Sequence, residues 1–113
     1  MKVIIAGSRT INSYTVVEAA IEASGFDITE VVSGCARGVD ALGEEFAYKN
    51  HIPVKLFPAD WDGLGKVAGF IRNTNMAKYA DALLAVYDGS SKGTAHMIAV
   101  AKRNGLKVFV YDA

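Results

Sequence analysis

A turn rich in glycine and hydroxyl side chains, at residues 88–94, is the stretch of this sequence best suited to chemistry. It reads Asp-Gly-Ser-Ser-Lys-Gly-Thr and follows an apolar run at 82–87 that is short enough to be a strand buried on both faces. After Thr94, Met97 and Ile98 begin a stripe at helical spacing. A glycine-rich turn between a strand and a helix directs free backbone N–H groups at an anion. We therefore predict a phosphate site made by Asp88, Gly89, Ser90, Ser91, Gly93 and Thr94.

Comparable turns follow two earlier apolar runs, although none has the spacing of a Walker A loop or of the dinucleotide-binding fingerprint. Gly7-Ser8-Arg9 follows the run at 2–6, and a Ser-Gly-Cys-Ala-Arg-Gly-Val-Asp segment at 33–40 follows the run at 29–33. Guanidinium and hydroxyl groups at such turns are typical phosphate contacts. These turns add Gly7, Ser8, Arg9, Ser33, Gly34, Arg37, Gly38 and Asp40 to the candidate nucleotide-binding and phosphate-binding residues.

Arg72 and Asn73 complete the candidate site. They share a helical stripe with Met76, which should face the sheet, but they lie in the first turns of a helix predicted from about 66 to 80. A guanidinium that points inward at this place needs an anion. The anion would be either a ligand phosphate or a carboxylate such as that of Asp88.

These candidate residues lie at the ends of elements that alternate along the chain. Apolar runs predict strands at 2–6, 29–33, 52–57, 82–87 and 106–111, and helical stripes predict helices that begin near 13, 39, 66 and 94, with a loop at 58–66. This alternation predicts an α/β fold, a Rossmann-like three-layer sandwich with a five-stranded parallel sheet in the order 3-2-1-4-5. Because turns after parallel strands share one edge, the turns at 7–9 and 89–94 should face each other where the strand order reverses.

Composition limits the classes of protein. The 113 residues suffice for one domain, over 1–113, and 51% of them are hydrophobic, which argues against disorder. Twelve Lys and Arg balance twelve Asp and Glu, so the basic surplus typical of a duplex nucleic-acid binder is absent. With one cysteine, no apolar run of membrane-spanning length and no metal-ligand spacing, we expect a cytoplasmic protein without a metal, a cofactor or a membrane partner.

Taken together, Gly7-Ser8-Arg9, Ser33-Gly34-x-Ala36-x-Gly38-x-Asp40 and the 89–94 turn resemble the SLOG superfamily, which groups the DNA-processing protein Smf/DprA with the Lonely Guy cytokinin-activating enzymes. The resemblance covers nearly the whole chain and is closest to small stand-alone bacterial and phage members. In those, Ala68-Gly69-x-Ile71-Arg72-Asn73 and Ser91-x-Gly93-Thr94 recur in the same order. It implies a Rossmann-like domain that binds nucleotides or nucleotide-derived signals. Members often form homodimers, so a homodimer is an assembly to test.

The resemblance also frames the alternatives for function. Lonely Guy enzymes cleave an N-glycosidic bond with an arginine and the acid of a Pro-Gly-Gly-x-Gly-Thr-x-x-Glu-like signature, whereas here Gly93-Thr94 continues as Ala-His-Met-Ile at 95–98, with no glutamate. Our leading hypothesis is therefore a binding domain for a phosphorylated or ADP-ribose-like nucleotide, acting as a sensor, a sponge or an assembly partner. An N-glycosidase or phosphoribohydrolase that acts on nucleoside monophosphates and uses Arg72 is the second hypothesis, and single-stranded DNA binding is the third.

Several candidate residues also have a structural interpretation. Asp40 suits the first turn of any helix because of the macrodipole, and it could equally orient a sugar hydroxyl or an arginine. Cys35 lies near a helix N-terminus, where a thiol pKa can fall, but family members often have glycine here, which favours a small residue filling a tight loop. His96 could serve as an acid or base, and a partly buried structural role is the favoured interpretation. Trp61 could stack on a base or cover its loop.

Overall fold

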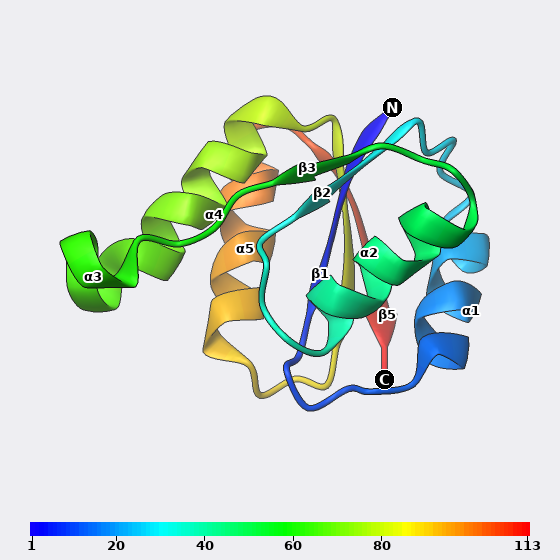
Figure 1. Cartoon of the computed structure of the whole chain (residues 1–113), viewed down its shortest axis with the longest axis horizontal. Helices are drawn as coiled ribbons and strands as arrows, with labels where there is room; N and C mark the ends of the chain where they lie inside the picture. The colour runs from blue at the N-terminus through cyan, green and yellow to red at the C-terminus, as the bar shows by residue number, and fades with distance from the viewer.

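A parallel sheet with the strand order β3-β2-β1-β4-β5 forms the centre of the computed structural model, which describes residues 1–113 (Figure 1). Each pair of neighbouring strands is parallel, so the predicted α/β class and the predicted strand order are both confirmed. The strands are β1 (Lys2–Gly7), β2 (Glu30–Ser33), β3 (Val54–Leu56), β4 (Ala82–Tyr87) and β5 (Lys107–Asp112).

Helices cover both faces of the sheet, as the predicted three-layer sandwich requires. One face packs on α1 (Tyr14–Ser24) and α2 (Val39–Lys49), and the other packs on α4 (Ala68–Tyr79) and α5 (Lys92–Arg103). The chain reaches α4 through a short helix α3 (Trp61–Leu64) and a 3-10 turn η1 (Gly65–Val67). None of these helices combines the length and the apolar content that crossing a membrane requires.

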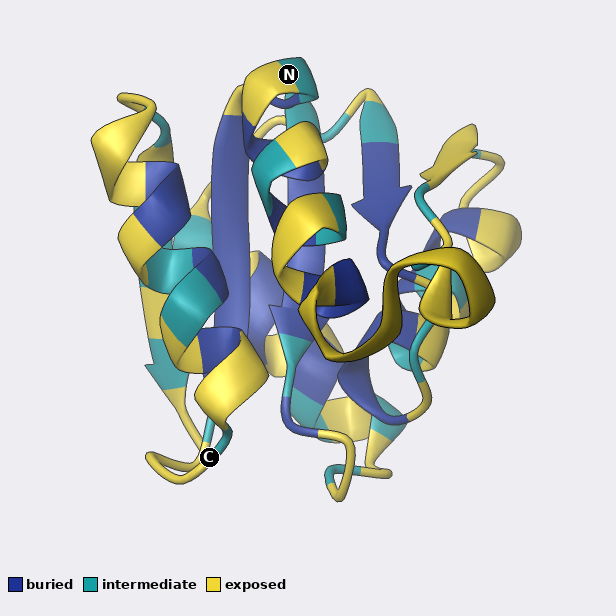
Figure 2. Cartoon of the chain, turned by 90° about the vertical axis from the view of Figure 1, so that its left-hand side faces the viewer, coloured by how far each residue is buried: buried dark blue, intermediate teal, exposed yellow.

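The central strands are buried on both sides because their side chains alternate between two cores. In β1, Val3 and Ile5 pack toward α1 and α2, whereas Ile4 and Ala6 pack toward α4 and α5. Figure 2 shows the inner strands buried and the outer faces of the helices exposed. A strand with a core on each side must be apolar at every position. This requirement explains why continuous apolar runs predicted β1 and β4.

Capping side chains set the starts of α1 and α5. Ser13 caps α1 by accepting a hydrogen bond from the Val16 N–H at 3.4 Å. The predicted start of α5 at Thr94 is wrong by two residues. Ser91 is the N-cap, because its hydroxyl accepts from the Thr94 N–H at 3.2 Å and the helix begins at Lys92. Thr94 therefore lies inside the first turn of α5.

Two boundaries differ from the sequence expectation. The loop predicted at 58–66 contains α3, whose first turn is closed by Asp60 accepting from the Gly63 N–H at 2.9 Å. The third strand, predicted over 52–57, pairs only over Val54–Leu56 and is exposed throughout. This strand lies at the edge of the sheet, so a single neighbour holds it in the ladder.

Candidate functional site

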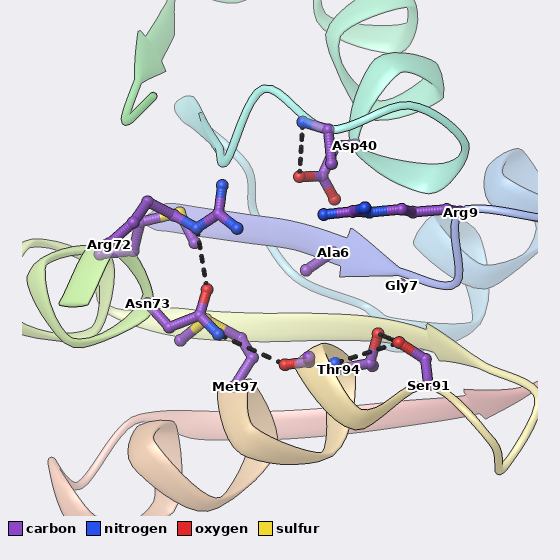
Figure 3. A pocket seen from close by; sticks show the side chains of 12 residues that line it. Ala6, Gly7, Arg9, Asp40, Arg72, Asn73, Ser91, Thr94 and Met97 are labelled. Carbon is purple, nitrogen blue, oxygen red and sulfur yellow. Dashed lines mark hydrogen bonds between the residues drawn. The ribbon is translucent and has the colours of Figure 1, made fainter. Parts of the chain in front are cut away.

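A small pocket opens at the carboxyl edge of the sheet, beside the end of β1 and the first turns of α2, α4 and α5 (Figure 3). Its volume is about 60 Å³. The pocket lies where the strand order reverses between β1 and β4, which is the expected ligand position in an open parallel sheet. The lining residues are Ala6, Gly7, Arg9, Ala36, Asp40, Arg72, Asn73, Met76, Ser91, Gly93, Thr94 and Met97.

The structure brings half of the predicted residues to this pocket. The predicted residues that line it are Gly7, Arg9, Asp40, Arg72, Asn73, Ser91, Gly93 and Thr94. The predicted residues that lie outside its lining are Ser8, Ser33, Gly34, Arg37, Gly38, Asp88, Gly89 and Ser90. The end of β1 and the start of α5 border the same pocket, as expected for facing turns. Ligand binding by these residues stays a prediction.

Several of the predicted residues that lie outside the pocket lining hold the neighbouring loops in place. The buried Ser8 hydroxyl accepts from the Asp88 N–H at 3.4 Å and thereby joins the turns after β1 and β4. The buried Ser33 hydroxyl donates to Glu44 at 2.6 Å and accepts from the Cys35 N–H at 3.1 Å. Glu44 is half-buried through this hydrogen bond. Arg37 is exposed and does not line the pocket.

Two glycines permit close approaches that any side chain would block. Gly38 has φ 76°, and a Cβ at this position would stand 2.6 Å from the carbonyl oxygens of both Ser8 and Arg9. A Cβ on Gly34 would stand 2.7 Å from a terminal nitrogen of Arg72 and 2.9 Å from a carboxylate oxygen of Asp40. Gly34 and Gly38 therefore shape the site by leaving room for neighbouring atoms, although neither glycine lines the pocket.

Arg72 lies half-buried at the start of α4 and is held by neutral groups. Its Nε donates to the side-chain oxygen of Asn73 at 3.0 Å, and its Nη1 donates to the Gly34 carbonyl. The expected alternative partner, Asp88, does not contact it. The Asp88 carboxylate accepts from the N–H and the hydroxyl of Ser90 at 2.9 and 3.0 Å, and these bonds lower the pKa of Asp88. Asp88 therefore closes its own turn.

The carboxylate that acts on Arg72 is that of Asp40, which is 6% exposed. Burial raises the pKa of Asp40 to about 6, against the lowering effects of a 3.2 Å hydrogen bond from the Ala36 N–H and of the charges on Arg72 and Arg9. Figure 3 shows the Arg9 guanidinium beside this carboxylate. Burial also lowers the pKa of Arg72.

The balance of charge at the pocket is positive. Two guanidinium groups, those of Arg9 and Arg72, border it together with one carboxylate, that of Asp40, in a protein of zero formal net charge. Neither arginine forms a close ion pair, since the only one within 4 Å in the chain joins Lys49 and Glu45. A cleft with unneutralised positive charge favours an anion.

Sequence comparison places the chain in a family. A model of the "YspA, cpYpsA-related SLOG family" (YAcAr) matches residues 1–63. The chain is also 34% identical over 117 residues to the Gene 61 protein of Mycobacterium phage D29, covering 95% of this chain and 93% of that protein. The chain belongs to the YspA, cpYpsA-related SLOG family. The SLOG resemblance inferred from the motifs is thereby confirmed.

The fold of this SLOG protein is also found in a solved structure. The DNA processing protein A (DprA) of Streptococcus pneumoniae matches with a TM-score of 0.78 and 20% sequence identity. The match covers 96% of this chain and 49% of the DprA chain, so the SLOG chain spans about half the length of that relative. At this low sequence identity, the similarity to DprA shows a shared fold and nothing further.

Four apolar residues of the SLOG pocket were absent from the predicted set. They form part of its wall and are Ala6, Ala36, Met76 and Met97. Met76 and Met97 were expected on inward helical stripes and are buried. The signal that could have placed them in the pocket is their position one turn inside α4 and α5, next to Asn73 and Thr94.

His96 is held by contacts within the chain, and Cys35 lacks the surroundings of an activated thiol. The Nδ1 of His96 lies 3.1 Å from the Asn73 amide nitrogen, and its ring stacks on Phe70 with 4.2 Å between centroids. Burial and the charge of Arg103 lower the pKa of His96, so the neutral ring can accept from Asn73 at pH 7. Burial and Glu44 raise the pKa of the Cys35 thiol, which is opposite to an activated thiol. Cys35 has φ 64°, a left-handed conformation that is uncommon for residues other than glycine.

The raised pKa of Asp40 gives a prediction for stability. Its folded-state pKa of about 6 exceeds its ordinary value of 3.8, so the folded state binds the proton more tightly. The resulting stabilisation is fully present below pH 3.8 and is lost as the pH rises through 6. We expect Asp40→Asn to raise the free energy of unfolding at pH 7.5 by roughly 1–3 kcal/mol, with little effect near pH 4.

Urea denaturation at the two pH values checks this prediction, with Asp112→Asn at the exposed end of β5 as the control. The asparagine oxygen can keep the Ala36 hydrogen bond, so the change removes mainly the buried charge. A variant that is less stable than wild type at pH 7.5 would show that the two arginines outweigh the burial of Asp40.

Proposed function

We propose that this SLOG domain binds a phosphorylated nucleotide or a nucleotide-derived, ADP-ribose-like ligand at the carboxyl edge of its sheet, as a sensor, a sponge or an assembly partner. The observation that carries the proposal is the pair Arg9 and Arg72, which border one pocket without a close ion pair. Guanidinium groups recognise phosphate through paired N–H donors. A ligand phosphate would supply the negative charge that the pocket lacks.

The start of α5 supports a phosphate at the same place. The backbone N–H groups of Lys92 and Gly93 have no acceptor in the chain, whereas that of Thr94 is already bound by Ser91. Free N–H groups and the helix dipole make a helix start favourable for an anion. Gly93 lines the pocket together with the two arginines, so both kinds of donor converge on one space.

The size of the pocket suits part of a nucleotide. Its volume of about 60 Å³ is well below the roughly 300 Å³ or more of pockets that enclose a whole ligand. A phosphate group fits such a space, and the remainder of the ligand would extend over the rim. This size agrees with a site that recognises the phosphate end of its ligand.

A second candidate function, an N-glycosidase for nucleoside monophosphates, is favoured by Asp40 alone. A buried carboxyl group with a pKa of about 6 beside an arginine is the kind of group that serves as a general acid or base. It would have to replace the glutamate that is absent after Thr94. DprA, named a DNA processing protein, suggests single-stranded DNA as a third ligand, which salt-dependent oligonucleotide binding would reveal.

Incubation with AMP separates the first two functions. We expect the protein to retain AMP in equilibrium dialysis, to retain adenosine far less because it lacks the phosphate, and to release no adenine above background on chromatography. Adenine release that is lost in both Asp40→Asn and Arg72→Ala would establish the N-glycosidase instead. Equal retention of AMP and adenosine would contradict recognition through the phosphate.

A further inference from the structure

The surface next to the pocket determines where a nucleobase can lie. This inference rests on the proposed function: if a phosphate occupies the pocket of about 60 Å³, the base has no room inside it. The base must then lie outside, within one ribose of the arginines. Aromatic side chains at such a position are the usual partners of a base, because every base has a flat face that can stack.

Trp61 belongs to α3 and lies close to Arg72, which belongs to the start of α4. Its ring carbon Cη2 is 3.1 Å from the point where a Cβ on Gly69 would stand, and Arg72 Nη2 is 3.6 Å from the same point. The indole and the guanidinium therefore both lie over Gly69, whose missing side chain leaves the space for them. Arg72 lines the pocket, so Trp61 lies next to a pocket residue without lining the pocket itself.

The local structure holds Trp61 in place and leaves part of it free. Trp61 is the first residue of α3, which Asp60 caps and which projects from the body of the protein beyond the start of α4 (Figure 1). The side chain is 50% exposed, so it does not simply complete the core. A tryptophan that packs on a glycine and keeps half of its surface exposed has indole surface available for a second ring.

We propose that Trp61 is the base-stacking residue of this site, and that the ligand is a nucleoside phosphate whose base lies on the indole while its phosphate lies between Arg9 and Arg72. Stacking on an aromatic side chain tolerates different bases, so Trp61 would contribute affinity for a base in general. The order phosphate, ribose, base would then run outward from the pocket to α3.

Trp61 is the only tryptophan in the chain, so its fluorescence reports this position alone. We expect AMP to quench the emission with the same Kd that calorimetry measures. In Trp61→Ala the affinity for AMP should fall by about tenfold, and Trp61→Phe should recover most of the loss. The affinity for ribose 5-phosphate, which has the phosphate and sugar but no base, should be unchanged in both variants.

Leu64→Ala is the matched control, because Leu64 is another exposed apolar residue of α3. It should bind AMP as the wild type does. Unchanged AMP affinity in Trp61→Ala, or calorimetric binding of AMP without any change in emission, would overturn the stacking role and leave the phosphate site intact. An equal loss for AMP and ribose 5-phosphate would instead assign Trp61 to positioning Arg72. A wild type that binds neither compound would refute the phosphate site as well.

Discussion

Gly93→Val is expected to abolish the binding of AMP and ADP-ribose, a loss of at least about a hundredfold in affinity, while the protein stays folded. Gly93 lines the pocket in the first turn of α5, next to the free N–H groups. A Cβ on Gly93 would meet no atom within 4 Å, so the fold accommodates the added side chain. A valine would, however, stand between the backbone and an approaching phosphate.

Calorimetry with both ligands measures this effect, and a melting curve without ligand shows that the variant is folded. Ala95→Val is the matched control, because Ala95 is exposed on the same helix and does not line the pocket. It carries the same cost of a β-branched residue in a helix. Wild-type affinity in folded Gly93→Val would remove the start of α5 from the site.

Arg72→Ala should weaken nucleotide binding by about tenfold to a hundredfold, because it removes a charge-assisted contact worth roughly 1.5–3 kcal/mol. The free protein should lose only about 1 kcal/mol of stability, since the hydrogen bonds of Arg72 go to the neutral groups of Gly34 and Asn73. Arg72→Lys should give an intermediate affinity, because lysine keeps the charge without the planar fork. Calorimetry and urea denaturation provide the two readouts.

Lys78→Ala, which removes an exposed positive charge from the same helix, is the control for a general electrostatic effect. Both measurements are needed because Arg72 also lies near Asp40. If Arg72→Ala unfolds far more easily than wild type but binds AMP with wild-type affinity, Arg72 serves the fold through Asp40. The proposed centre of the site would then be wrong.

The sequence predicted the sheet because the relevant signals are local. The runs that became β1 and β4 are apolar at successive positions, which only burial on both faces explains. Helix caps are local as well, since Ser13 accepts from the Val16 N–H and the Gly25 N–H donates to the Glu22 carbonyl. The helix α3 escaped prediction because four residues carry no periodicity, and only the cap at Asp60 could have indicated it.

Side-chain partners were harder to predict because they depend on residues distant in the chain. Arg72 meets Gly34, 38 positions away, and acts on Asp40 rather than on Asp88. Ser8 and Ser33 look like phosphate ligands in the sequence, since hydroxyls after strands commonly serve that role. In the folded chain their hydroxyls bond to Asp88 and Glu44, which no local pattern reveals.

Burial of polar groups locates the site independently of motifs. The buried polar and charged residues of the chain are Ser8, Ser33, Asp40, Asn73 and Thr94, and all of them were predicted site residues. Buried polar groups are costly unless they are bonded, so their concentration at one edge of the sheet is informative. The structure divides these predicted residues into those that line the pocket and those that support its loops, and their role in ligand binding stays a prediction.

The most direct test of a phosphate-dependent nucleotide site is a melting measurement on the wild-type protein with a panel of nucleoside phosphates, ADP-ribose among them, and their dephosphorylated nucleosides. A ligand at a hundred times its Kd stabilises the folded state by about 2.7 kcal/mol, which raises the Tm of a domain of this size by several degrees. We predict such a rise with at least one phosphorylated compound and none with its nucleoside. A panel in which no phosphorylated compound shifts the Tm, or in which nucleosides shift it equally, would contradict the account.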